Sequence, residues 1–299
     1  MEERTVRVVA SYTTLPSRYG VLKESLKSLK NQTYKLDAVY VSLPKIASRL
    51  GTPYPPLPDD FGDLCTVVES EIDYGPITKI YGALVSESNP TTVIISCDDD
   101  VLFEPNFVEV LMTHHKKDPS CCVCGTGALI GKGLAFISIV SSLKDFRKWR
   151  WVTGFSVGPK GRNIDLVFGV GGVLYTRSMF PEKDNLYEEL FRHSMEDKAI
   201  FHNDDVLISG YLSKKKIKKR LFLDIPEITH GTDSADALSA DVIPMITRME
   251  EAIQRVISLG YFTDMEELDV EETPAFKGLL FILMVILIIL LSVCMYDNI

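Results

Sequence analysis

The sequence predicts an α/β protein built on a mixed, mainly parallel sheet with helices on its faces, followed by a C-terminal transmembrane helix. The first part rests on short β-branched stretches that alternate with helical patterns over the first 110 residues, as is typical of parallel sheets with helical crossovers. The second part rests on the run "GLLFILMVILIILLSVCM" at 278–295, which contains no charged residue. At about 1.5 Å per residue, such a helix nearly spans the roughly 30 Å hydrocarbon layer of a bilayer.

Four strands and three helices are expected before residue 120. The strands are "TVRVVAS" at 5–11, "AVYVSLP" at 38–44, "CTVVES" at 65–70 and "TTVIISC" at 91–97, because each is short and rich in β-branched residues. Apolar residues recur at helical spacing around 22–29, 77–84 and 107–111. In a sheet of this kind, ligands bind beyond the carboxyl ends of the strands.

The second half of the chain is less regular. We expect strands at 134–140, 149–157 and 173–176, and helices at 187–200, 205–214 and 244–259. The segment "DMEELDVEETP" that follows is acidic and is interpreted as a solvated linker. We therefore divide the chain into a folded domain at 1–262, a juxtamembrane linker at 263–277 and a transmembrane helix at 278–296.

Charge and flanking segments narrow the class of protein. The chain has 32 basic and 41 acidic residues and a formal net charge of −9, which argues against nucleic acid as a partner. The N-terminal stretch lacks the apolar region of a secretory signal. Few residues follow the apolar run, so we expect a single-pass C-terminal anchor in a membrane and a catalytic domain in the cytosol. The six cysteines are expected to stay reduced in that compartment. Lys277, next to the run, agrees with this orientation.

Two clusters have a structural and a functional interpretation. The segment "HHKKDPSCCVC" at 114–124 lacks the second spaced ligand pair of a zinc site, which favours a strand of small apolar residues over metal binding. The basic block "KKKIKKR" at 214–220 is interpreted as a helix end and a turn before the strand "LFLDI". Contact with anionic lipid headgroups is the alternative.

The stretch "VIISCDDDVLFEP" at 93–105 places three carboxylates, Asp98, Asp99 and Asp100, at the end of an apolar strand. Adjacent carboxylates repel one another unless water or a cation neutralises them. Oxygen ligands suit Mg²⁺ or Mn²⁺, and either ion can stabilise a departing diphosphate. An acidic surface turn is the structural alternative.

An ordered set of motifs then resembles a known family. The segments "TTLPSR", "LKNQTY", "DYGPITK", the strand capped by "DDD", "GVGGVLYTR" and "HNDDVLISGYL" are similar, in this order, to blocks of GT-A glycosyltransferases of the family 2 type. The resemblance covers Val6 to His230 and implies a GT-A fold, Rossmann-like, that binds a nucleotide-diphosphate sugar.

The resemblance implies a metal site and its ligands. Asp98 and Asp100 match the two carboxylates of the family's DxD motif, with Asp100 the expected direct ligand of Mn²⁺ or Mg²⁺. Asp98 is expected to bind the metal or to lie nearer the ribose or a metal-bound water, and the role of Asp99, in the same nucleotide-sugar site, stays open. His230 occupies the position of a third metal ligand, and a purely structural histidine is the alternative.

Other residues are expected to hold the nucleotide sugar. Lys79 lies in the first turn of a helix that begins at a Gly-Pro turn, where backbone amides attract anions, so it is expected at the diphosphate. Asp73 would accept a hydrogen bond from the base or ribose, and Arg18 would line the nucleotide pocket. In the loop "GVGG", Gly171 and Gly172 would let the backbone approach the donor sugar. A solvated lysine and a simple tight turn are the structural alternatives.

Two further aspartates are candidates for catalysis. The family position favours Asp205 as the general base, and either Asn203 or Asp204 can cap the helix that begins there. If both aspartates only cap the helix, neither is catalytic. The expected activity is metal-dependent transfer of a hexosyl group from a UDP- or GDP-sugar to a glycan, lipid or protein acceptor, with inversion favoured.

Two other functions are considered. The strand "VIISCDDDV" also resembles the motif of haloacid dehalogenase-like phosphatases, but there the motif usually lies on the first strand, whereas three strands precede it here. A GT-A domain that has lost activity and serves as a membrane scaffold is the non-enzymatic alternative.

Overall fold

The computed structural model describes residues 6–48, 51–130, 136–141, 160–181, 186–226, 228–230 and 242–262. The linker at 263–277, the apolar segment at 278–296 and the strand expected at 149–157 lie outside the described residues. Among the helices within the described ranges, none is long and apolar enough to cross a bilayer. The membrane anchor therefore stays a prediction.

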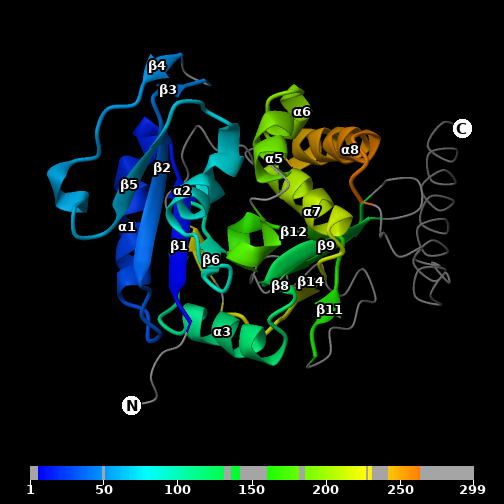
Figure 1. Cartoon of the computed structure of the whole chain (residues 1–299), viewed down its shortest axis with the longest axis horizontal. Helices are drawn as coiled ribbons and strands as arrows, with labels where there is room; N and C mark the ends of the chain where they lie inside the picture. Colours follow the sequence, from blue (N-terminus) through cyan, green and yellow to red (C-terminus); the bar gives the residue numbers. More distant parts are fainter. Residues whose placement is uncertain are drawn as a thin grey trace, which may run out of the picture.

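An eight-stranded sheet forms the centre of the fold (Figure 1). Its strands, in spatial order, are β11 (Arg162–Asn163), β14 (Lys219–Leu221), β8 (Cys122–Cys124), β13 (Val173–Thr176), β6 (Val93–Ser96), β1 (Val8–Thr13), β2 (Ala38–Pro44) and β5 (Thr66–Ser70). The neighbours β5, β2, β1 and β6 are parallel, as are β14 and β8. β13 is antiparallel to β6 and to β8, and β11 is antiparallel to β14. The predicted α/β class with a mixed, mostly parallel sheet is confirmed.

All four strands expected in the first half of the chain are present, as β1, β2, β5 and β6. In β1, Val8 and Ala10 belong to one hydrophobic cluster and Val9 to the other, because successive side chains of a strand point to opposite faces. Both faces of the strand are therefore buried, which explains why it reads as a continuous apolar run.

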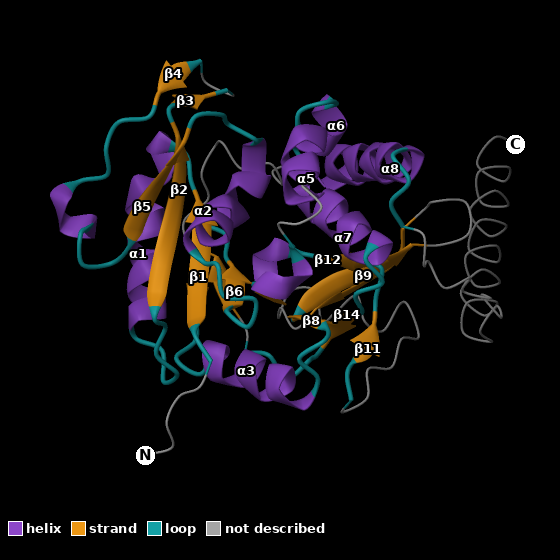
Figure 2. Ribbon diagram, in the orientation of Figure 1, coloured by secondary structure: helices purple, strands orange, loops and turns teal. Residues whose placement is uncertain are grey.

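Helices cover both faces of the sheet (Figure 2). α1 (Tyr19–Lys30) and α3 (Phe107–Lys117) pack on the face of Val8 and Ala10. α2 (Thr78–Ser86) and α7 (Asp204–Lys214) pack on the face of Val9. α5 (Leu186–Ser194), α6 (Lys198–Phe201) and α8 (Val242–Ser258) pack against α7.

Two boundaries differ from the sequence prediction. The single helix expected at 187–200 is instead α5 and α6, because Asp197 caps α6 by accepting a hydrogen bond from the Ala199 amide at 2.7 Å. The strand expected in "LFLDI" is β14, which begins at Lys219 inside the basic block. There Lys219 is buried, and its Nζ donates to Ser213 Oγ at 2.6 Å.

Smaller sheets complete the fold. β9 (Thr126–Ile130) pairs with β10 (Phe136–Ser141) and β12 (Leu166–Val167), and β3 (Ile46–Ala47) pairs with β4 (Thr52–Pro53). β7 (Val101–Phe103) pairs with β15 (Ile228–His230).

One edge of the central sheet collects the ends of several elements. β1 and β6 run in the same direction, so the residues that follow them meet at one edge. β13 runs the other way, so the short helix η5 (Gly169–Gly171) that precedes it reaches the same edge. This geometry brings together segments that are far apart in the sequence.

Candidate functional site

The acidic triplet lies between β6 and β7, at this edge of the sheet. The side chains of Asp98 and Asp100 are 29% and 30% exposed, whereas that of Asp99 is 5% exposed. Asp98 follows β6, and Asp99 and Asp100 lie in the turn between β6 and β7, so the turn directs Asp99 inward and leaves its two neighbours partly exposed. Asp98 and Asp100 are thus the accessible carboxylates of the triplet.

Lys79, in the first turn of α2, is paired with two aspartates. Its Nζ lies 2.6 Å from Asp98 Oδ1 and 2.9 Å from Asp204 Oδ2, and the latter contact is an ion pair without hydrogen-bond geometry. Burial alone would lower the pKa of this ammonium group, but the nearby Asp204 and Asp98 raise the pKa well above its usual value. Lys79 therefore stays charged. It was expected to contact the diphosphate of a nucleotide, and in this structure its charge is paired with Asp98 and Asp204.

Arg18, at the end of η1 (Pro16–Arg18), binds the other two members of the triplet. Its Nη1 lies 2.9 Å from Asp99 Oδ1, and its Nη2 pairs with Asp100 Oδ2. Thr14 Oγ1 donates to Asp99 Oδ2 at 2.5 Å. Burial raises the pKa of Asp99 to about 6, although Arg18 and Thr14 favour its charged form.

Thr14 is a site residue that the sequence prediction missed. It follows β1 directly, and β1 is the parallel neighbour of β6. Its position after a strand at the carboxyl edge was the available signal.

The acidic pair at the start of α7 faces the triplet. Asp204 is buried and reaches Lys79, while Asp205 accepts the Gly169 amide with both oxygens, at 3.0 and 3.1 Å. Burial and the neighbouring Asp204 raise the pKa of Asp205 well above its usual value. The N-cap residue is Asn203, whose side chain makes no capping hydrogen bond. Asn203 thus occupies the N-cap position, as one of the two predicted alternatives has it, but without a side-chain capping bond, and Asp204 is the first residue of the helix.

The three glycines before β13 have different surroundings. A Cβ on Gly169 would lie 2.7 Å from Lys79 Nζ, 3.2 Å from Asp205 Oδ1 and 3.3 Å from Asp98 Oδ1. On Gly171 it would meet Thr126 Oγ1 at 2.8 Å, and on Gly172, which has φ +67°, it would meet the ring of Phe107 at 2.5 Å. Gly169 is therefore the glycine that adjoins the aspartates, whereas Gly171 and Gly172 are buried against other parts of the domain.

Asp73 makes two contacts with the backbone. Its Oδ1 accepts the Gly75 amide at 2.8 Å and its Oδ2 accepts the Ser48 amide at 2.7 Å. Both oxygens thus order the turn before η3 (Gly75–Ile77) and the end of β3. Contact of this carboxylate with a base or ribose would compete with these bonds.

The donor set of the site fits a hard divalent cation in part. Asp98 and Asp100 each have one oxygen bound by a basic side chain, and both side chains stay partly exposed. The backbone of His230 pairs with Val101, directly after the triplet, and its role as a metal ligand stays a prediction. Within the described ranges, no three His, Cys, Asp or Glu side chains already form a metal cluster. The aspartates at 98–100 and 204–205 outnumber Lys79 and Arg18, so the site retains negative charge that attracts a cation.

The histidine and cysteine segment has a structural role. His114 Nε2 lies 2.8 Å from Asp224 Oδ1, and its ring stacks on Phe222 at 3.7 Å. Cys122 and Cys124 are buried in β8, and they belong to no metal cluster within the described part of the chain. The predicted strand of small apolar residues is confirmed.

The basic block is only partly exposed. Lys219 is buried, and Lys214 lies 4.7 Å from the centre of the Tyr261 ring. Lys216 and Lys218 are exposed. The exposed part of the block is therefore smaller than its sequence indicates.

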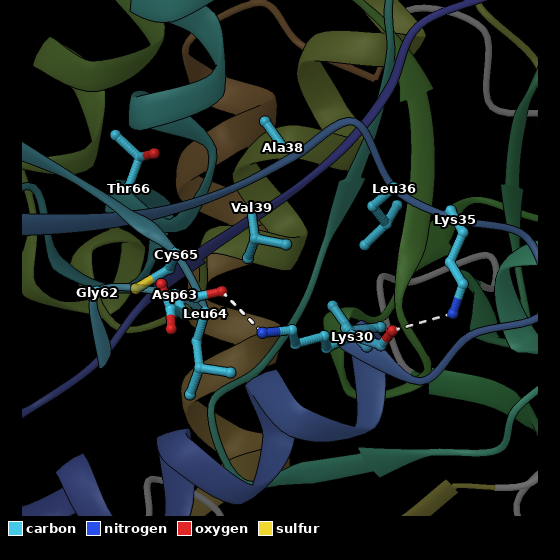
Figure 3. A pocket seen from close by; sticks show the side chains of 11 residues that line it. Lys30, Lys35, Leu36, Ala38, Val39, Gly62, Asp63, Leu64, Cys65 and Thr66 are labelled. Atoms are coloured by element: carbon cyan, nitrogen blue, oxygen red, sulfur yellow. Dashed lines mark hydrogen bonds between the residues drawn. The ribbon is translucent and has the colours of Figure 1, made fainter. Parts of the chain in front are cut away.

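A pocket of about 520 Å³ lies away from the aspartates (Figure 3). It is lined by the end of α1, the start of β2 and the segment before β5, including Lys30, Lys35, Val39, Leu64 and Cys65. Lys30 Nζ donates to the Asp63 carbonyl, and Lys35 Nζ donates to the Lys30 carbonyl, both at 3.3 Å. These strand ends are at the amino edge of the sheet, so we place the candidate site at the aspartates and not in this pocket.

Compared with models of protein families, the chain matches none, and compared with curated proteins it shows no significant match.

Proposed function

We propose that this protein is a metal-dependent glycosyltransferase with a GT-A fold, which moves a sugar from a nucleotide-diphosphate donor to an acceptor hydroxyl. The observation that carries the proposal is the meeting of Asp98, Asp100, Lys79 and Asp205 at the carboxyl edge of a mixed, mostly parallel sheet. Ligands of open α/β sheets bind at this edge. The motif resemblance implies the same type of sheet and the same site.

Asp98 and Asp100 would hold Mn²⁺ or Mg²⁺, with His230 as a third ligand. Their accessible carboxylate oxygens suit either ion. A bound divalent cation supplies positive charge that stabilises a departing nucleoside diphosphate. The sugar donor would be a UDP- or GDP-sugar, and the acceptor a glycan, a lipid or a protein.

Asp205 would be the general base. Burial and the neighbouring aspartate raise the pKa of its carboxyl group, which increases its ability to take a proton from an acceptor hydroxyl. Asp204 is engaged by Lys79 at 2.9 Å, so it is better suited to orient that lysine. Proton transfer to Asp205 during attack on the anomeric carbon favours inversion.

The Gly169 amide would orient the base, because it donates to both oxygens of Asp205. Gly171 and Gly172 would act through the shape of the loop. Asp73 would act in the same way, by holding the turn before α2.

The decisive experiment measures binding and turnover with the full chain in detergent. UDP, GDP and their sugars are screened by thermal shift with and without Mn²⁺, and hydrolysis of the bound sugar nucleotide is then followed. A ligand at 100 times its Kd stabilises by about 2.7 kcal/mol, a readily measured shift. The Asp100→Ala variant is expected to lose the metal-dependent shift, whereas Asp99→Ala retains more of it. Absence of any nucleotide shift, together with phosphate release from a simple phosphomonoester, would favour a phosphatase.

The C-terminal segment is proposed to anchor this domain in a membrane, with the domain in the cytosol. A chain that ends at residue 276 is expected to be soluble and to bind nucleotide as the full chain does, since an acidic linker separates the apolar run from the last domain helix. The measurement is sedimentation with membranes and nucleotide affinity of both forms. Aggregation of the shortened chain would contradict the anchor and would indicate a core segment.

A further inference from the structure

Arg18 and Lys79 both neutralise the acidic triplet, but their surroundings differ. The side chain of Lys79 is 6% exposed, and its ammonium lies between two carboxylates beside Gly169. A buried ion pair of this kind is costly to break, because the remaining charge is left without a partner. Lys79 therefore serves as the counter-ion of Asp98 and of the buried Asp204.

The contact between Arg18 and Asp100 is more accessible. Arg18 is 14% and Asp100 30% exposed, so the pair is partly buried, but water and cations can reach the Asp100 carboxylate and compete for it. The contact between Arg18 and Asp99 is of the other kind, since Asp99 is 5% exposed and is also held by Thr14. The two ends of one guanidinium group thus have a buried partner, Asp99, and a more accessible partner, Asp100.

The guanidinium group also has an unused donor. Arg18 Nε is buried and has no hydrogen-bond partner among the described residues. A buried donor without a partner is uncommon in folded proteins. Arg18 thus keeps one donor that no described residue uses.

We propose that Arg18 exchanges partners when ligands bind: it releases Asp100 to the divalent cation, keeps Asp99 as its anchor, and turns the freed Nη2 to the phosphates of the nucleotide. This inference rests on the proposed function. Arginine suits the role because its planar group carries five donors and binds carboxylate and phosphate in the same geometry. Arg18 acts first as a competitor of the metal and then as a ligand of the diphosphate, so metal and nucleotide favour each other's binding.

The exchange predicts that removal of Arg18 raises the affinity for Mn²⁺ and lowers the affinity for nucleotide. The test compares the single variant Asp99→Asn with the double variant that carries both Arg18→Met and Asp99→Asn. Asp99→Asn is present in both, so that removal of Arg18 does not leave the buried Asp99 carboxylate without a counter-ion. Full-length proteins in detergent are titrated with Mn²⁺ alone, followed by the electron paramagnetic resonance of free Mn²⁺, and then with UDP or GDP in Mn²⁺ by calorimetry. Removal of Arg18 is expected to tighten Mn²⁺ binding about fivefold, since the cation no longer competes with a partly exposed ion pair for Asp100. Nucleotide binding is expected to weaken at least about tenfold.

Lys23→Met is the matched control for general electrostatics. Lys23 lies in α1 near Arg18, but it pairs with Asp60 and takes no part in the triplet. It is expected to change both affinities by less than about twofold. Thermal unfolding of every variant confirms that it is folded.

The outcomes separate the inference from the function on which it rests. If Mn²⁺ and nucleotide bind to the wild type but Mn²⁺ binding stays the same or weakens without Arg18, the exchange is wrong while the proposed function stands. An equal gain in Lys23→Met would attribute the effect to net charge and would also overturn the exchange. If the wild type binds neither Mn²⁺ nor nucleotide, both proposals fail.

Discussion

Replacing Lys79 by methionine tests whether the buried ammonium holds the site together. The substitution keeps most of the side-chain volume but leaves Asp98 and Asp204 without the cation that lies 2.6 and 2.9 Å from them. Removing one partner of a buried ion pair typically costs about 3–5 kcal/mol. Because Asp98 is 29% exposed and can be solvated, most of this cost should arise from Asp204, which is 9% exposed. We therefore expect a loss of about 3 kcal/mol in the free energy of unfolding.

The assay is urea unfolding followed by circular dichroism at pH 7. The double variant Lys79→Met and Asp204→Asn removes the buried charge as well and should recover at least about 1 kcal/mol of the loss. Lys23→Met, which breaks a more exposed pair with Asp60, should cost less than about 1 kcal/mol. A Lys79→Met cost below that of Lys23→Met, or no recovery in the double variant, would refute the buried ion-pair network.

Three further predictions concern the glycine loop and the aspartates. Gly172→Ala should destabilise the domain by about 2–4 kcal/mol, through its positive φ and the contact with Phe107. Gly169→Ala should cost less, about 1–2 kcal/mol, and should also weaken nucleotide binding, because the added Cβ displaces Lys79 Nζ from its aspartates. Urea unfolding measures the two stability losses and calorimetry the nucleotide affinity; a larger stability loss in Gly169→Ala would contradict this order. Asp205→Asn should lower the rate of sugar transfer about 10²- to 10⁴-fold while nucleotide and metal binding are retained. Asp204→Asn should keep more activity than Asp205→Asn. If turnover assays show Asp204→Asn to be the less active variant, the roles of the two aspartates are exchanged. Burial raises the pKa of Asp99 to about 6, so the folded state binds the Asp99 proton more tightly than the unfolded state does. The free energy of unfolding should therefore fall by up to about 3 kcal/mol as the pH rises from about 4 to 6. If urea unfolding of Asp99→Asn has the same pH dependence as that of the wild type, Asp99 is not responsible.

The regular elements could be predicted because their signals are local. β1, β2, β5 and β6 were expected from runs of β-branched residues, and α1, α2 and α3 from apolar residues at helical spacing. The division between α5 and α6 was not predicted, because the apolar spacing continues across it while a single carboxylate, Asp197, starts a new helix. The start of β14 was also missed, since a lysine inside a basic block does not suggest a buried strand residue.

The sequence named most of the residues that meet at the candidate site but missed Thr14, and it could not give their contacts. The acidic triplet stood out because three carboxylates end an apolar strand. That Arg18 and Thr14 bind the buried Asp99 could not be read from the sequence, since both lie in the segment that follows a different strand, β1. Asp73 was expected to face a ligand, and only the fold brings the Ser48 and Gly75 amides to its two oxygens.

The sequence by itself determined the α/β class, the order of strands and helices in the first half of the chain, and the presence of a carboxylate group at the end of β6. These properties depend on the periodicity and chemistry of neighbouring residues. Only the tertiary structure decided which charges are paired. Lys79, Asp98 and Asp204 lie on different segments of the chain and meet at one edge of the sheet. They meet there because β13 lies antiparallel beside β6, which brings Gly169, and with it the start of α7, to that edge. Charge pairing depends on distance and burial, which are set by strand order and helix packing, and a sequence pattern contains neither quantity.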